Sequence, residues 1–166
     1  MFTVHATRKL LDRCGGVSSD ERPTSTTLGD WYATALFWRP QVALFVNEGT
    51  RLPVFVRLAP VATVVERFAG QLGRVLGLHG IDPRFVAAEL GEMGVFRFAK
   101  TENRSVVGSL NEFAFLAEVQ RDRDAEVDLV VLSMQLSRTP CGPLRQRSGF
   151  PDLELRAVAD RAMGPT

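Results

Sequence analysis

Residues 42–57 read VALFVNEGTRLPVFVR and decide the fold around them. Two runs rich in β-branched and aromatic residues, Val42–Val46 and Leu52–Arg57, flank a turn over residues 47–51, which predicts a β-hairpin. The first run is apolar on both faces, so we expect it to be covered on both sides. Pro53 cannot donate a hydrogen bond to a neighbouring strand, so the second strand is expected to lie at an edge of the sheet or to begin there.

Outside the hairpin, local patterns predict two further strands and a series of helices. Alternation of side chains predicts strands over Phe2–Ala6 and Val95–Lys100. Capping residues and apolar residues at helical spacing predict the helices. These cover residues 8–14, 27–38, 60–78, 83–93 and 151–163, with a helix that opens at Ser105 or Ser109 (Ser109 and Glu112 form a capping box) and another over 124–137. Residues 15–26 have loop composition, and we expect them to be flexible.

Together these elements predict an α+β fold. We expect a single compact domain over residues 1–164, with a small mixed sheet of about four strands and one hairpin packed with five to seven helices. The helix–turn–helix proportions of residues 61–93 do not indicate a DNA-reading module, because Glu89 and Glu92 on the second helix would repel phosphate.

The composition excludes several classes of protein. The chain has 166 residues, of which 45% are hydrophobic, and a formal net charge of +1. These values exclude intrinsic disorder and collagen-like repeats, and the balanced charge removes any whole-chain argument for a polyanionic partner. Without a signal peptide or an apolar run of about 20 residues, we expect a cytoplasmic protein with no membrane association. Cys14, Cys141, His5 and His79 lack the spacing of a zinc site, so neither a metal nor a cofactor is predicted.

The richest polar cluster follows the strand that ends at Lys100 and leads into a helix. A strand-to-helix corner exposes backbone N–H groups and the positive end of a helix dipole, which suits an anion. We therefore predict an anion-binding site there, with Asn47 and Glu48 of the hairpin turn nearby and Arg138 in a second cationic cluster. Its members are Lys100, Thr101, Asn103, Arg104, Ser105, Ser109 and Asn111.

The scarcity of Lys and Asn adds weight to this corner. Of the 20 cationic residues, 18 are Arg, and Lys100 is one of the two Lys; the chain has Asn only at positions 47, 103 and 111. A compact ammonium suits a point contact to phosphate. The alternative is ordinary capping, because strand-to-helix loops need Asn and Ser at these positions in any case, and Arg138 could pair with a carboxylate at a helix end.

Three functions remain open from the sequence. The first is a binding module whose corner holds an anionic partner, with the phosphate of a nucleic acid or nucleotide as the natural candidate. The second is an enzyme that uses the same corner with Glu48 or Glu112 as acid or base, although the sequence lacks GxSxG, HExxH and GxxxxGK motifs. The third is a structural or partner-binding module, which an exposed apolar patch around Trp31 and Trp38 would favour.

Five segments of the chain, taken in order, resemble a bacterial family of unknown function. Its members share a strand followed by TxKLL at the start and a KTxNRSVxGSxN core. Leu110 and Gly49 depart from the residues expected there, but neither lies in the polar cluster. The resemblance covers almost the whole chain, implies one compact domain, and brings no activity, substrate or catalytic residues with it. The segments are ATRKLL (Ala6–Leu11), LGDWYA (Leu28–Ala33), LFVNE (Leu44–Glu48), KTENRSVVGSLNEFAF (Lys100–Phe115) and RTPCGPL (Arg138–Leu144).

Overall fold

Five strands form one mixed sheet in the order β4-β3-β2-β1-β5 in the computed structural model, which describes residues 1–123 and 126–165. The strands are β1 (Phe2–Ala6), β2 (Trp31–Leu36), β3 (Val42–Asn47), β4 (Pro53–Arg57) and β5 (Phe96–Lys100). The α-helices are α1 (Arg8–Cys14), α2 (Val64–Leu78), α3 (Pro83–Gly91), α4 (Arg104–Arg123), α5 (Leu129–Leu136) and α6 (Pro151–Met163). Short 3-10 turns lie at Val61–Thr63, Glu92–Gly94 and Gly142–Leu144.

The sheet joins a parallel part to an antiparallel meander. β1 runs parallel to both of its neighbours, β2 and β5, whereas β2, β3 and β4 follow one another in antiparallel order. Ala6 therefore lies beside both Ala33 and Lys100. The carboxyl ends of β1, β2 and β5 consequently point to the same edge of the sheet.

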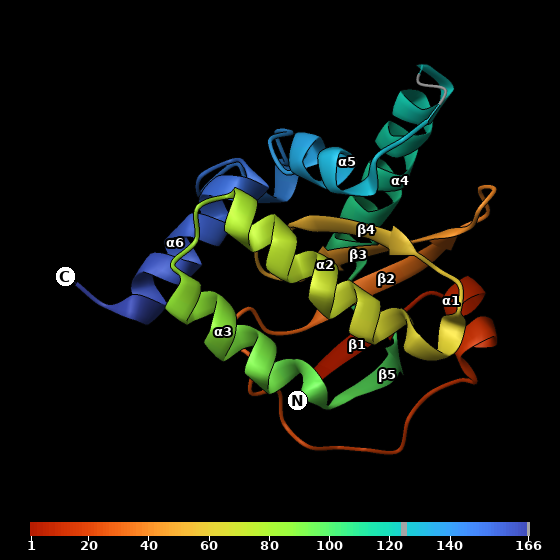
Figure 1. The fold of residues 1–166 in the computed structure, drawn as a ribbon, viewed down its shortest axis with the longest axis horizontal. Coiled ribbons are helices and arrows are strands. Elements are labelled where there is room, and N and C mark those ends of the chain that lie inside the picture. The colour runs from red at the N-terminus through yellow and green to blue at the C-terminus, as the bar shows by residue number, and fades with distance from the viewer. Residues whose placement is uncertain (124–125, 166) are drawn as a thin grey trace.

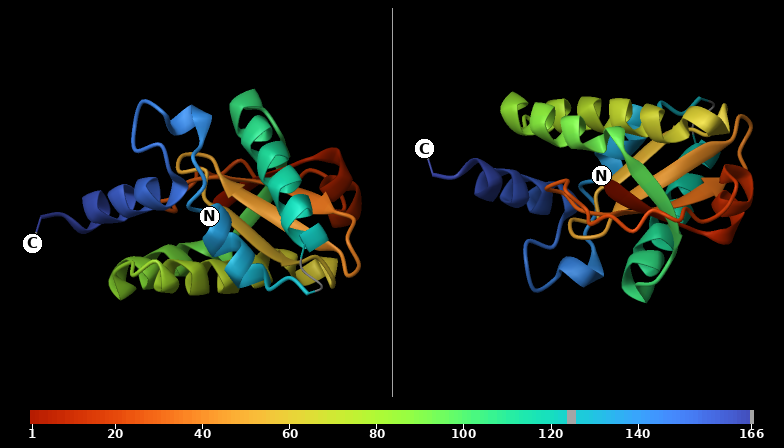
Figure 2. Two further views of the ribbon diagram at one scale, coloured as in Figure 1. Left: turned by 90° about the horizontal axis from the view of Figure 1, so that it is seen from above. Right: turned by 90° about the horizontal axis from the view of Figure 1, so that it is seen from below.

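Helices cover both faces of the sheet, as Figures 1 and 2 show: α2 and α3 lie on one face and α4 on the other. The core under α2 contains Phe2, Trp31 and Phe45, and Phe45 stacks on Phe68 of α2 with ring centroids 4.1 Å apart. A second core lies under α4 and α5, and the sheet contributes Tyr32, Leu44 and Phe55 to it. The helices contribute Val106, Leu110, Phe113, Ala117 and Leu132. Side chains alternate between the faces along each strand, so successive residues enter different cores.

The structure confirms the predicted α+β architecture, the mixed sheet and the hairpin. It differs over residues 27–38, where the sequence predicted a helix and the structure places strand β2. The apolar spacing there is coincidental, because all six residues of β2 are buried and a strand covered on both faces has no polar side. With β2 included, the sheet has five strands, where about four were expected.

Two predicted helix starts were also wrong. α4 begins at Arg104, so Ser109 and Glu112 lie inside the helix and form no capping box. Asn103 caps it instead, since its Oδ1 accepts from the backbone N–H of Ser105 at 3.0 Å. α5 begins only at Leu129, where Asp128 Oδ1 accepts from Val130 N at 2.9 Å; the predicted start of that helix, residues 124–125, lies outside the described residues.

The loop over residues 15–26 contains neither helix nor strand, as expected. It is attached to the sheet, because Ser18 Oγ accepts from Phe98 N at 3.0 Å and Ser25 N donates to Met1 O at 2.9 Å. Its flexibility stays a prediction. Among the described residues, no helix has the length and apolar character needed to cross a bilayer.

Candidate functional site

Arg51, the last residue of the hairpin turn, combines an unusual backbone with an unusual side chain. Its φ is +61°, in the left-handed region that costs an L-residue about 1–2 kcal/mol. The residue is only 7% exposed, and its guanidinium makes one hydrogen bond within the described residues, from Nη2 to Ser105 Oγ at 3.1 Å. Nε is buried and has no partner there, and no carboxylate of the described chain lies within ion-pair distance.

Burial lowers the pKa of the Arg51 guanidinium, and the nearby cation of Arg147 acts in the same direction. The guanidinium nevertheless stays charged, because the ordinary pKa of arginine lies far above neutrality. A cation removed from water without a counter-charge in contact is costly. The hairpin therefore holds a positive charge whose hydrogen-bonding capacity is largely unused.

Asn47 fixes the turn that carries Arg51. Its side chain is fully buried, and its Oδ1 accepts from both the N–H and the hydroxyl of Thr50 at 2.9 Å. Its Nδ2 donates to Leu28 O at 2.9 Å, which ties the hairpin to the loop before β2. The amide of this predicted site residue is thus occupied by structural hydrogen bonds.

A cavity of about 320 Å³ opens beside Ser105, the partner of Arg51. One wall is α4, and the other is the loop Thr139–Pro143 after α5. Residues 105, 108, 109 and 112 recur at spacings of three and four, so the helix presents them on one face. The cavity is lined by Ser105, Gly108, Ser109, Glu112, Phe113, Thr139, Pro140, Cys141, Gly142 and Pro143. Its lining thus combines apolar groups, such as Phe113, with polar ones, as small-molecule sites do.

Cys141 lies in the loop wall of the cavity, with Sγ 3.9 Å from Ser109 Oγ. Burial raises the pKa of the Cys141 thiol; the charge of Arg51 acts to lower this pKa, and that of Glu112 acts to raise it. The thiol is therefore protonated near neutral pH, and it is a poor nucleophile in that state. The Cys141 thiol is therefore influenced by both a cation and a carboxylate.

The residues of the anion site predicted at the end of β5 lie on different faces of the sheet. Lys100 follows Phe98 by two residues and pairs with Ala6, so its exposed side chain leaves the sheet on the face of α2. Asn103 lies on the other side, where its N–H donates to the Tyr32 hydroxyl at 2.9 Å and its side chain caps α4. The cap takes up helix N–H groups that the sequence analysis had assigned to an anion.

The structure brings only some of the other predicted site residues to the cavity. Ser105 and Ser109 line it, and Glu48 lies close enough to Arg51 to affect its pKa. The remaining members are not among its lining residues: Thr101, Arg104 and Asn111 lie before or on α4, and the exposed Arg138 follows α5. Lys100, Arg104 and Asn111 line neither this cavity nor the larger one between α3 and α6, so their convergence with a carboxylate, which the enzyme hypothesis required, is not found at either.

His5 forms the centre of a second polar cluster, between β1, β2 and β5. Its Nδ1 lies 3.0 Å from Lys100 O and its Nε2 lies 3.3 Å from Asp30 Oδ2, so both ring nitrogens face acceptors. Both nitrogens must carry a proton to donate, which makes His5 an imidazolium. Burial acts to lower the pKa of His5, but the hydrogen bonds to Asp30 and to the Lys100 carbonyl outweigh it and raise the pKa.

The rest of this cluster is equally well satisfied. Asp30 also accepts from Thr3 N at 3.0 Å and from the Thr24 hydroxyl. Burial acts to raise the pKa of Asp30, but the hydrogen bonds from His5, Thr24 and Thr3 lower it overall. Tyr32 stacks on His5 with ring centroids 4.7 Å apart. The cluster links three strands and leaves no hydrogen-bonding group over for a ligand among its named contacts.

No group of three or more side chains that could hold a metal ion is found in residues 1–123 and 126–165. Trp31 and Trp38 are 1% and 5% exposed, so these two side chains form no exposed apolar patch of the kind that would favour a partner-binding module. Trp38 Nε1 donates to Glu118, and Arg121 lies over its ring. The observation that would have favoured a partner-binding module is therefore missing from this part of the surface.

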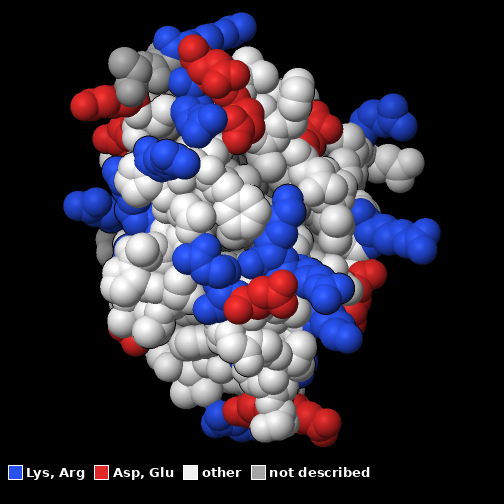
Figure 3. Space-filling view, turned by 90° about the vertical axis from the view of Figure 1, so that its right-hand side faces the viewer, with Lys and Arg blue, Asp and Glu red and all other residues white. Residues whose placement is uncertain are grey.

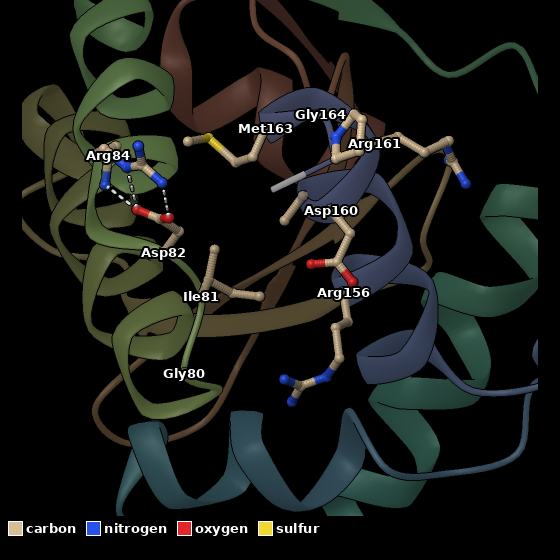
Figure 4. A pocket seen from close by; sticks show the side chains of 11 residues that line it. Gly80, Ile81, Asp82, Arg84, Arg156, Asp160, Arg161, Met163 and Gly164 are labelled. Carbon is tan, nitrogen blue, oxygen red and sulfur yellow. Dashed lines mark hydrogen bonds and ion pairs between the residues drawn. The ribbon is translucent and has the colours of Figure 1, made fainter.

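A larger cavity, of about 820 Å³, lies between the start of α3 and the end of α6 (Figure 4). Two of its arginines are already bonded, since Arg84 donates to Asp82 through Nη2 at 2.7 Å and Arg156 Nη2 donates to His79 O at 3.0 Å, whereas the Asp160 carboxylate has no partner among the described residues. The Arg161 side chain points away from the hollow in Figure 4. Size alone favours this cavity, but the unpartnered buried atom found in the described residues belongs to Arg51, which is bonded to Ser105 of the smaller cavity, so we assign the site to the smaller one.

Lys and Arg side chains gather on the face of the molecule that Figure 3 shows. On α1, Arg8, Lys9 and Arg13 are exposed, Lys9 Nζ lies 5.8 Å from the centre of the exposed Phe37 ring, and Arg13 Nη1 donates to Gln41 Oε1 at 2.7 Å. These contacts hold cations at the surface without burying them. Such charge attracts anions from a distance but does not define a binding site.

The chain belongs to the DUF6933 family, a domain of unknown function, whose model matches residues 3–154. This finding confirms the resemblance seen in the sequence. The match includes Arg51 and the whole cavity beside α4, whereas much of the α6 wall of the larger cavity lies beyond residue 154. A search of the curated proteins finds no significant match, and neither does a search of the solved structures.

Sequence reasoning missed Arg51, which is the residue that marks the site. Nothing in its context separates it from the other 17 arginines, because a cation at the end of a hairpin turn is ordinary. Cys141 entered the sequence analysis as a rejected zinc ligand and as part of the RTPCGPL segment. That segment and the polar cluster on α4 are nonetheless the two motifs that meet at the cavity, so their common place in one family pattern was the available signal.

Proposed function

We propose that this protein is a binding module that holds the anionic group of a small ligand in the cavity between α4 and residues 139–143. The single observation that carries the proposal is the buried Arg51 guanidinium with its unpartnered Nε. A chain normally avoids burying a cation without a counter-charge, and in native proteins an unsatisfied buried group commonly marks a functional position. Arg51 does not itself line the cavity, so a phosphate or carboxylate bound there would act as its counter-charge across Ser105.

Ser105 connects the guanidinium to the cavity. Its hydroxyl oxygen accepts from Arg51 Nη2 at 3.1 Å, which leaves the hydroxyl proton free for donation to a ligand oxygen. The exposed position of Ser105 on the first turn of α4 also places that oxygen near the positive end of a long helix. A hydrogen bond that involves a charged group contributes about 1.5–3 kcal/mol, so a few such contacts suffice for measurable affinity.

The size of the cavity favours a small ligand over a nucleic acid strand. A volume of about 320 Å³ lies at the lower end of the range for small-molecule sites. We therefore favour a free phosphate compound, such as a nucleoside monophosphate, over the phosphate backbone of RNA or DNA. We place the protein in the bacterial cytoplasm as part of the same proposal, because Cys14 and Cys141 are both free thiols.

Calorimetric titration with inorganic phosphate and with adenosine monophosphate tests this proposal. Arg51→Met keeps the apolar stem but removes the charge, and we expect it to weaken binding by about tenfold or more, the equivalent of one charge-assisted hydrogen bond. Arg84→Met is the matched control, because Arg84 is an exposed cation already paired with Asp82, and it should bind as the wild type does.

Two results would overturn the proposal: no binding of either anion at low salt, or equal affinity in wild type and folded Arg51→Met. Mixed single-stranded oligonucleotides serve as the comparison ligand. Tighter Arg51-dependent binding of oligonucleotides than of the monophosphate would replace the small ligand with a nucleic acid.

A further inference from the structure

We infer that the cavity selects a ligand with an anionic group at one end and a protonated amine at the other, and that Glu112 recognises the amine. This inference rests on the proposed function, since the anionic end is the group that Arg51 and Ser105 hold. It gives Glu112 a role in specificity in place of the acid–base role considered from the sequence.

The geometry of α4 separates the two ends of the cavity. Ser105 and Glu112 both line it and are seven residues apart, which is about two helical turns on nearly the same face, or about 10 Å along the axis. Cys141, on the opposite wall, experiences the charges of both Arg51 and Glu112. The cavity is therefore bipolar, with a cation behind one end and a carboxylate at the other.

The carboxylate of Glu112 has no hydrogen-bond or ion-pair partner among the residues that the structure describes. Glu118, less than two turns further along α4, shows the usual arrangement: it accepts from Trp38 Nε1 and pairs with Arg121 at 3.2 Å. A carboxylate at the rim of a cavity would disfavour a simple anion. Such a carboxylate favours an anionic ligand that also carries a positive charge.

Apolar residues also line the cavity: Phe113 of α4 and two prolines of the loop, Pro140 and Pro143. Methylene groups would bury their surface there, at about 25 cal/mol per Å² of apolar area removed from water. The ligand that fits these three features is an aminoalkyl phosphate or an ω-amino carboxylate, with an extended apolar chain between its charges.

Butyl phosphate and 4-aminobutyl phosphate, which differ only in the terminal amine, test this inference by titration calorimetry. We expect the wild type to bind the amine-bearing compound about three- to fivefold more tightly, the gain expected of a partly exposed ion pair. Glu112→Gln should remove this preference and leave the affinity for butyl phosphate the same or higher. Glu102→Gln, the same change at an exposed residue outside the cavity lining, should keep the wild-type preference.

The outcomes separate the two proposals. If both compounds bind equally to the wild type, or if Glu112→Gln keeps the preference, the inference about Glu112 is wrong while Arg51-dependent phosphate binding stands. If neither compound binds, the proposed function fails as well. Hexanoate and 6-aminohexanoate, used as a second pair, show whether the anionic group is a carboxylate and not a phosphate.

Discussion

Two polar regions of this molecule lie near the β5–α4 connection, and they differ in how many partners their buried cations have. In the His5–Asp30–Tyr32 cluster the buried cation faces two acceptors, and its carboxylate partner accepts three hydrogen bonds. In the hairpin turn the buried cation of Arg51 has one hydrogen bond and no counter-charge in contact among residues 1–123 and 126–165. The first region uses its polar groups to join strands, and the second leaves one unused.

This difference separates a structural cluster from a binding site. A network that satisfies every member stabilises the fold and has nothing to offer a ligand. An unsatisfied buried group costs stability, and a ligand can recover that cost on binding. Charge and burial are similar in the two regions, so the count of missing partners is the property that distinguishes them.

The largest effect is expected where the satisfied network is broken. Asp30→Ala leaves the His5 imidazolium without its counter-charge and Thr3 N without an acceptor, so we expect a loss of about 3 kcal/mol in the free energy of unfolding. Urea denaturation measures it. Asp20→Ala is the matched control, because Asp20 pairs only with the exposed Arg22, and it should leave the midpoint unchanged. A loss below about 1 kcal/mol in Asp30→Ala would contradict the structural role.

A smaller effect of opposite sign is expected at the unsatisfied group. Arg51→Met removes a buried charge without a counter-charge, so we expect the protein to gain about 1 kcal/mol of stability in the absence of ligand. Arg67→Met provides the contrast, since the Arg67 guanidinium donates to the carbonyls of Arg57 and Pro60, and it should lose about 1 kcal/mol. Equal destabilisation by both variants would show that Arg51 is a structural residue.

The smallest effect is the pH dependence of the two histidines, whose pKa values shift in opposite directions. The pKa of His5 is raised above 6.5, so its contribution is complete below pH 6.5 and is lost as pH rises through the folded-state pKa. Burial lowers the pKa of His79, so its contribution is complete above pH 6.5 and is lost as pH falls through the folded-state pKa. These two groups therefore produce a stability maximum near pH 6.5.

Urea denaturation between pH 5 and pH 9 measures this profile. His5→Gln should remove the decline above pH 6.5, and His79→Gln should remove the decline below it. His79 is a suitable counterpart because its environment is simpler: Nε2 donates to the Ser137 hydroxyl at 3.1 Å, which itself donates to Met134 O. An unchanged alkaline decline in His5→Gln would rule out His5 as its source.

Most of the fold was predictable from local patterns. The hairpin, β1, β5 and the helices that begin at Arg8 and Pro83 carry turn, alternation or capping signals within a few residues. The exception is β2, because its surroundings and not its sequence determine whether these residues form a strand or a helix. A buried strand such as WYATAL lacks a polar face, and the helical spacing of Trp31 and Ala35 is compatible with both states.

The candidate site was predictable only in part, because it depends on contacts between distant segments. The sequence indicated Ser105 and Ser109, which the structure places at the cavity. It also indicated Lys100, which the pleat of β5 directs to the other face of the sheet. It could not indicate Arg51, because the burial of that side chain follows from the packing of the hairpin turn beside α4, 54 residues away.

The parallel pairing of β1 has a consequence for the order of folding. β2, β3 and β4 are neighbours in sequence and pair locally, whereas the ladder between β1 and β5 joins residues that lie 94 positions apart in the chain. Long loops are closed at an entropic cost before their contacts form, so we expect the β1–β5 ladder to be late. The carbonyl of Lys100 reaches His5 only through that ladder. During synthesis the meander around Arg51 thus takes shape first, and the closed polar network completes the sheet last.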